Sequence, residues 1–80
     1  MTSDEIRDKV IKIFRDVLDD ETIVLHHETT AKDVEGWDSL SHIGLIYAIE
    51  KEFKIKFNLV EIKPLKKAGE LFELIKAKLP

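Results

Sequence analysis

Apolar residues recur at intervals of three and four along the first part of the chain. This spacing predicts an amphipathic helix of about sixteen residues that ends near Leu18. Thr2 and Glu5 are three residues apart, as in the capping box that starts many helices. The predicted apolar face consists of Ile6, Val10, Ile13, Phe14 and Val17.

Residues 19–37 show no sustained helical or strand-like spacing of apolar residues. Connections of this length are uncommon in small domains and usually have a function when they are ordered. Isolated apolar residues predict an ordered loop that packs across the helices. These residues are Ile23, Val24, Leu25, Val34 and Trp37.

A second long helix is predicted from Asp38 or Ser39 to Phe53, with Asp38 as a favourable N-cap. Its apolar residues form two sets on different faces, and a helix in a chain this small has little room to bury both. The first set, expected in the core, is Leu45, Ile46, Ile49 and Phe53. The second set, expected to face a partner, is Leu40, Ile43 and Tyr47. Gly44 costs about 1 kcal/mol relative to alanine within a helix, so we expect a close approach of another segment there.

The last third of the chain predicts one short and one longer helix. Residues 54–57 alternate between lysine and apolar side chains, as a strand does. They have no second strand to pair with, so they are expected to form an extended loop. Asn58 can cap one or two helical turns before Pro64, and a last helix begins at Gly69-Glu70. Its apolar residues are Leu71, Phe72, Leu74, Ile75 and Leu79. The prediction is an all-α fold: a small four-helix bundle with three main helices, one short helix and a long first loop, forming a single domain over residues 1–80.

Composition narrows the classes of function. The chain has 80 residues and no cysteine, which excludes disulfides, thiolate nucleophiles and cysteine-based metal sites. A net charge of −3 argues against nucleic acid as a partner, because phosphate binding needs a basic surface. No apolar run reaches the roughly 18 residues that span a bilayer, and the charged N-terminus does not resemble a signal peptide. We therefore expect a cytoplasmic monomer that binds neither nucleic acid nor membrane.

The charge is unevenly distributed along the chain. Residues 1–53 carry 13 acidic and 6 basic side chains, and residues 54–80 carry 3 acidic and 7 basic ones. Solvated helix faces are the simplest interpretation of such a pattern. The alternative is that partners meet an acidic first half and a basic last third.

Neither catalysis nor metal binding is favoured by the motifs. Ser39 lacks the G-x-S-x-G context of a hydrolase nucleophile, although His42 lies one turn later and could form a hydrogen bond with it. The adjacent His26 and His27 do not have the spacing of zinc ligands, and residues 19–21 lack the pattern of a calcium loop. We expect no catalytic residue and no metal site.

Ser39 is nevertheless the most informative polar residue. Asp38 can cap the helix without it, and a long loop ends at this serine, where exposure is expected. A phosphate on a hydroxyl at a helix N-terminus is stabilised by backbone N–H groups and by the helix dipole. These features suggest a phosphoryl-linked modification of Ser39, with partner recognition along the helix that follows.

The segment Gly36-Trp37-Asp38-Ser39-Leu40 resembles the signature of the acyl carrier protein family. The resemblance extends over essentially the whole chain, because the order of helices and the entry to the last helix through residues 67–71 are also similar. It continues through the second helix with Ile43, Leu45-Ile46, Ala48-Ile49, Glu50, Glu52 and Phe53.

The resemblance implies a non-catalytic carrier. A phosphopantetheinyl transferase would transfer 4′-phosphopantetheine from coenzyme A to Ser39, with Asp38 positioning the junction between loop and helix. Leu40, Ile43 and Tyr47 would dock acyl-loading and acyl-processing enzymes, with Glu50 and Glu52 attracting basic partners. Leu45, Ile49 and Leu71 could shelter the acyl chain, although ordinary core packing is the favoured interpretation for these three.

Several residues depart from the carriers of ordinary fatty acid synthesis, which are more acidic. His42 and Gly44 stand where acidic side chains are common in that group, and Pro64 and the lysine-rich end are also unusual. The departures point to a specialised free-standing carrier with dedicated partners, for example in polyketide, lipid-modification or polysaccharide pathways. The function that the resemblance implies is that of an acyl carrier in fatty acid, polyketide or related specialised lipid biosynthesis. Two alternatives remain: a carrier of aminoacyl or peptidyl groups, and an unmodified helical adaptor.

Overall fold

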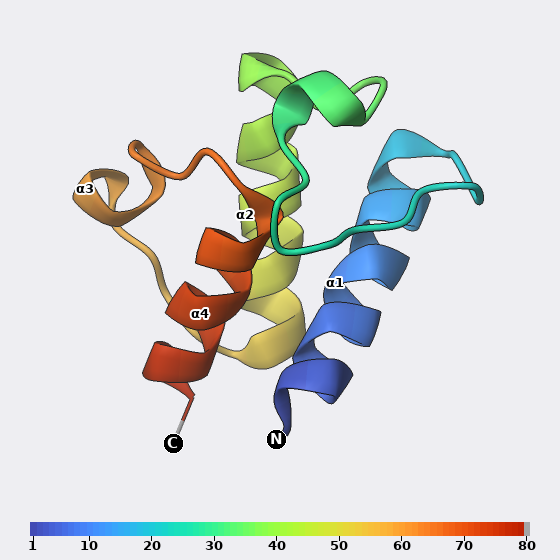
Figure 1. Cartoon of the computed structure of the whole chain (residues 1–80). Coiled ribbons are helices and arrows are strands. Elements are labelled where there is room, and N and C mark those ends of the chain that lie inside the picture. Colours follow the sequence, from blue (N-terminus) through green and yellow to red (C-terminus); the bar gives the residue numbers. More distant parts are fainter. Residues whose placement is uncertain (80) are drawn as a thin grey trace.

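The computed structural model describes residues 1–79, which contain four α-helices and one 3₁₀ helix joined by loops (Figure 1). The helices are α1 (Ser3–Leu18), η1 (Ala31–Asp33), α2 (Ser39–Phe53), α3 (Leu59–Ile62) and α4 (Ala68–Lys78). The predicted all-α bundle of three main helices and one short helix is confirmed. None of the helices in residues 1–79 is long and apolar enough to span a membrane.

Helix α1 begins at the predicted capping box. The backbone N–H of Glu5 donates to Thr2 Oγ1 at 3.2 Å, and the backbone N–H of Thr2 donates to Glu5 Oε1 at 2.9 Å. The predicted face is buried except for Val17, which is exposed and lines a shallow hollow with Ala48. The prediction for Val17 was wrong because the short side chain of Ala48 leaves this edge of the α1–α2 contact unfilled.

The core lies between α1, α2 and α4. Helix α1 packs against both of the other long helices, and its Phe14 is fully buried. The first apolar set of α2 is buried as predicted, together with Leu71, Phe72 and Ile75 of α4. Leu45, Ile49 and Leu71 are each no more than 1% exposed, so they pack as ordinary core.

The loop between α1 and α2 is ordered and contributes to the core. Ile23, Leu25, Val34 and Trp37 are buried, as predicted. Val24 is exposed, because neighbouring side chains of an extended segment point to opposite sides. The loop is anchored to α1 where Arg15 Nε donates to the backbone carbonyl of Ile23 at 2.8 Å.

The same loop clamps the start of α4. Thr30 and Lys67 form an isolated antiparallel bridge, and the backbone N–H of Gly69 donates to the carbonyl of His27 at 3.0 Å. A Cβ atom at Gly69 would lie only 2.8 Å from that carbonyl oxygen, so the contact requires glycine. At Gly44, by contrast, a Cβ would meet nothing within 4 Å in the described structure. The expected close approach at Gly44 was therefore wrong within this chain.

Helix α3 is short and held by its neighbours. The backbone N–H of Glu61 donates to Asn58 Oδ1 at 3.0 Å, which confirms the predicted cap. Glu61 also pairs with Lys78 of α4 at 2.8 Å, and the ammonium of Lys78 lies 5.8 Å from the ring centroid of Phe57. Residues 55–58, which lead into α3, belong to neither a helix nor a strand. Lys54, predicted as part of an extended loop, is instead the left-handed C-cap of α2. Figure 1 shows α3 to the side of the three long helices.

Candidate functional site

Ser39 is the first residue of α2 and is exposed. The N-cap is completed without it: Asp38 Oδ1 accepts hydrogen bonds from the backbone N–H groups of Leu40 at 3.0 Å and Ser41 at 2.9 Å. The hydroxyl of Ser41 accepts from the backbone N–H of Asp38 at 2.9 Å and donates to the carbonyl of Gly36 at 2.6 Å. Within residues 1–79, no hydrogen bond occupies the Ser39 hydroxyl, so its oxygen is available to react.

The Asp38 carboxylate changes the electrostatics expected at this helix end. Hydrogen bonds from the backbone of Ser41, then from the backbone of Leu40 and the Ser41 hydroxyl, lower the pKa of Asp38 although partial burial opposes them. Asp38 is therefore anionic at neutral pH. The backbone N–H groups of Leu40 and Ser41, which were expected to help hold a phosphate, already donate to Asp38. The positive end of the helix dipole still favours an anion at this position.

Trp37 and His42 form a pair beside Ser39 that the sequence pattern did not indicate. Trp37 Nε1 donates to His42 Nδ1 at 3.1 Å, and the two rings stack with centroids 6.2 Å apart. The indole also meets the ring of Phe14 edge-on, with centroids 4.9 Å apart. The hydrogen bond considered between His42 and Ser39 is not formed, because His42 Nδ1 is directed at the indole.

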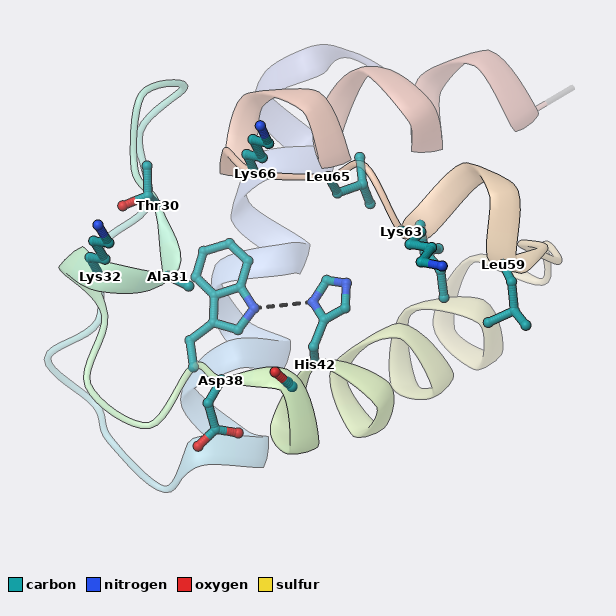
Figure 2. A pocket seen from close by; sticks show the side chains of 12 residues that line it. Thr30, Ala31, Lys32, Asp38, His42, Leu59, Lys63, Leu65 and Lys66 are labelled. Carbon is teal, nitrogen blue, oxygen red and sulfur yellow. Dashed lines mark hydrogen bonds between the residues drawn. The ribbon is translucent and has the colours of Figure 1, made fainter.

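Ser39 opens onto a groove of about 1010 Å³ between the start of α2, η1 and the segment from α3 to α4 (Figure 2). Its apolar lining is Ala31, Trp37, Leu59, Ile62 and Leu65. Three lysines, Lys32, Lys63 and Lys66, also line it. The groove is not predictable from the sequence, because its walls come from three segments that are far apart in the chain and that no local spacing of residues relates.

The second apolar set of α2 is exposed, as expected. Leu40, Ile43 and Tyr47 are 83%, 67% and 65% exposed, respectively. The acidic residues assigned to the same surface behave differently. Glu50 is half-buried and accepts a hydrogen bond from the backbone N–H of Phe57 at 2.7 Å, while Glu52 pairs with Lys9 at 3.3 Å. A docking role for these residues stays a prediction.

The structure shows no metal cluster in the described part of the chain: no three His, Asp or Glu side chains are gathered there to hold an ion. His27 lies 4.0 Å from Glu73 and its ring is tilted against Phe72, whereas His26 is exposed. The two histidines thus have separate surroundings.

The described residues form a small helical bundle with an exposed serine at the start of α2. No family model matches the chain, and no curated protein matches it. Among solved structures, the chain is similar to the solution NMR structure of a holo acyl carrier protein from Geobacter metallireducens. The two are 48% identical, with a TM-score of 0.85 over 91% of this chain and 84% of the other. The chain belongs to the acyl carrier protein family, and it is a carrier protein rather than an enzyme.

The prosthetic group of this family is 4′-phosphopantetheine, and the surroundings of Ser39 fit it. The Ser39 hydroxyl is exposed, and within residues 1–79 it makes no hydrogen bond that would compete with a phosphodiester bond. The groove beside it has apolar walls for the arm and three lysines for anionic groups. No side chain in the described structure blocks the hydroxyl with a hydrogen bond.

Acidification is expected to weaken the fold through His42. Burial lowers the pKa of His42, and a hydrogen bond to the backbone of Ile62 opposes only part of this effect. In the unfolded chain the pKa is about 6.5, so the unfolded state binds more protons just below that value. The stability from neutral His42 is complete above about pH 6.5 and is lost as the pH falls toward the folded pKa. Urea unfolding at pH 7.5 and 5.5 should therefore give a lower midpoint at the acidic pH.

His42→Gln tests the assignment of this pH dependence. The variant has no imidazole to protonate, so its midpoint should change less between the two pH values. His26→Gln is the matched control and should keep the wild-type difference. The pKa of Asp38 is lowered, so Asp38 stays ionised throughout this range and does not contribute. An unchanged pH dependence in His42→Gln would contradict the prediction.

Proposed function

We propose that the chain, as one domain, is an acyl carrier protein that bears 4′-phosphopantetheine on Ser39 and serves fatty acid, polyketide or related specialised lipid biosynthesis. The observation that supports this most strongly is the state of the serine hydroxyl. Ser39 is exposed beside a completed N-cap, while Ser41 uses its hydroxyl in two hydrogen bonds with the loop. Of these two serines, Ser39 is the one whose hydroxyl makes no hydrogen bond within residues 1–79, which supports modification there.

The attachment reaction needs a phosphopantetheinyl transferase, coenzyme A and a divalent metal ion. Ser39 Oγ forms a bond to the phosphorus that carries pantetheine, and the pyrophosphate bond of coenzyme A breaks. Adenosine 3′,5′-bisphosphate leaves with the bonding electron pair, and the hydroxyl proton passes to a base of the transferase. The thiol of the bound arm supplies the thioester chemistry that a chain without cysteine lacks.

This chain's own residues present and orient the hydroxyl. Asp38 fixes the first turn of α2 through two backbone N–H groups, so the position of Ser39 is set by the helix. Leu40 follows directly and, being strongly exposed, would contact both the arm and a docked enzyme. Ile43 and Tyr47 continue the apolar surface along α2, and Glu50 would mark its end.

The charge of this surface favours specialised partners. From Ser39 to Ile49, α2 contains no acidic residue, and the nearby carboxylate of Glu50 is engaged with the backbone. Attraction of a basic partner by α2 is therefore weak, so docking would depend on the apolar residues. Loading and processing enzymes with an apolar binding face would suit this carrier.

Intact mass spectrometry tests the attachment. The purified apo protein is incubated with coenzyme A, magnesium and a promiscuous phosphopantetheinyl transferase, and should gain the mass of one phosphopantetheinyl group. Ser39→Ala should gain nothing. Ser41→Ala is the matched control two residues away and should still be modified, although it loses part of the N-cap.

Two results would overturn the proposal. An unmodified wild-type protein would favour the helical adaptor, and a mass gain that survives Ser39→Ala would place the arm elsewhere. An aminoacyl or peptidyl carrier would pass this test, so the thioester isolated from the native host is needed to distinguish it. A fatty or polyketide acyl group on that thioester supports the proposal, and an amino acid contradicts it.

A further inference from the structure

The exposed apolar surface of α2 continues onto α3. Leu59 and Val60 of α3 are 76% and 82% exposed. Leu59 lines the same groove as Ser39 and His42, so the two helices adjoin along this groove (Figure 2). Five of the eight large apolar side chains that are exposed in the described part of the chain belong to α2 and α3, which concentrates them on one surface. We call this surface the α2–α3 face, and its apolar residues are Leu40, Ile43, Tyr47, Leu59 and Val60.

The carboxylates near this face are all engaged within the protein. Residues 38–63 contain four of them: Asp38, Glu50, Glu52 and Glu61. Glu52 pairs with Lys9 of α1 at 3.3 Å, and Glu61 pairs with Lys78 of α4 at 2.8 Å. The other two accept hydrogen bonds from backbone N–H groups. Two of the four negative charges are therefore neutralised by lysines of other helices, and none of the four carboxylates is without a partner.

The lysines of the same segment remain without such partners. Residues 38–63 contain four lysines, and none has a carboxylate within 4.0 Å among the described residues. Lysines elsewhere on the chain are also exposed and unpaired, so the distinguishing feature of this segment is that its carboxylates are used and its lysines are not. On α1, by contrast, Asp16 has no basic partner within 4.0 Å in the described structure.

Two of these lysines lie at the edge of the α2–α3 face. Lys51 comes one helical turn after Tyr47 on α2, so the two side chains are neighbours on the helix surface. Lys63 is the C-cap of α3, one turn after Leu59, and both line the groove. The face thus has an apolar centre and a basic edge, although the whole chain has a net charge of −3.

From this arrangement we infer that the α2–α3 face docks partner proteins whose binding surface is apolar at its centre and acidic at its edge. The inference rests on the proposed carrier function and specifies the chemistry of its partners. The apolar residues would be buried in the contact, and Lys51 and Lys63 would face carboxylates. A basic partner would instead bring its charges toward these two lysines, and like charges placed together disfavour a complex.

Three amphipathic helical peptides of equal length test the inference on the intact protein. All three have the same leucine face, and the positions beside it are glutamate, glutamine or lysine. Each peptide is titrated at low salt into the isotope-labelled protein, in both the apo and the holo form. Shifts of the backbone amide signals locate the binding site, and their dependence on peptide concentration gives the Kd.

The glutamate peptide should shift the amide signals of α2 and α3. It should bind roughly two- to fivefold more tightly than the glutamine peptide for each exposed ion pair that it forms. The lysine peptide should bind this face more weakly than either, although the net charge of the chain favours a basic ligand. At about 0.5 M salt the three affinities should converge, because charges are then screened over a few ångströms.

Two double variants assign the preference to the edge of the face. Lys51→Gln with Lys63→Gln should abolish the preference for glutamate and leave the affinity for the glutamine peptide unchanged. Lys12→Gln with Lys76→Gln is the matched control: it removes the same charge from exposed positions on α1 and α4 and should keep the preference.

Three results would overturn the inference. These are tighter binding of the lysine peptide at α2 and α3, equal affinities of the glutamate and glutamine peptides, and no shift at α2 and α3 with any peptide. An equal effect of the two double variants would overturn it as well. Failure of the proposed function is a separate result, because it appears as absence of the phosphopantetheinyl mass gain, and the titration of the apo protein does not depend on that modification.

Discussion

Replacing Trp37 with alanine should lower the free energy of unfolding by about 3–5 kcal/mol, the usual cost of removing a large buried aromatic side chain. Trp37 is buried, contacts Phe14 edge-on at 4.9 Å between centroids and donates to His42 at 3.1 Å. A chain of this size has a total stability on the order of 4–12 kcal/mol. The variant should therefore be marginally folded, and its loop before Ser39 should lose its anchor.

Urea unfolding followed by circular dichroism measures this effect. Trp37→Phe is the informative second variant, because it keeps an aromatic ring against Phe14 but has no indole N–H for His42. It should cost about 1 kcal/mol for the lost hydrogen bond, plus part of the ring contact. If alanine and phenylalanine variants were equally stable, the indole would not be the anchor described here.

Gly69→Ala should destabilise the protein by about 1–3 kcal/mol, as overpacking of a tight contact does. The added Cβ would lie 2.8 Å from the carbonyl oxygen of His27 and 2.9 Å from its Cα. Both are backbone atoms, so no side-chain rotation can relieve the clash. The loop must move away from α4, which strains the hydrogen bonds of Ala68 to Thr29 and of Gly69 to His27.

Gly44→Ala is the matched control, since the same substitution is made in another helix. Nothing lies within 4 Å of the added Cβ there, and alanine is the better helix former. Its free energy of unfolding should rise by about 0.5–1 kcal/mol. Denaturation midpoints of the two variants should thus move in opposite directions. A destabilised Gly44→Ala together with an unaffected Gly69→Ala would contradict the packing seen at both glycines.

The helices were predictable because their signals are local. Spacing of apolar residues identified α1 and the buried side of α2, and the caps at Thr2, Asp38 and Asn58 gave the helix starts. The errors occurred where neighbours in space decide exposure. Val17 and Val24 are apolar yet exposed. Val17 is exposed because the side chain of Ala48 is too short to cover it. Val24 is exposed because neighbouring side chains of an extended segment point to opposite sides.

The site shows the same division. The sequence predicted Asp38 as the N-cap of α2 and the exposure of Ser39, Leu40, Ile43 and Tyr47, and the structure confirms these placements. Ser39 as the attachment site stays a prediction. The engagement of Glu50 with the backbone of Phe57 was not, because it depends on how the chain turns after α2. The groove was missed for a related reason: Lys32 and Lys66 lie far apart in the chain and line one groove only after the loop has been clamped to α4.

The sequence by itself determined the helical class, the family and the serine at the start of α2, because each depends on residues a few positions apart. Tertiary structure alone decided what surrounds that serine. The indole–imidazole pair, the close approach at Gly69 and the lysine-lined groove all arise from contacts between distant segments. Such contacts depend on the packing of loop and helices, which no local period or motif records.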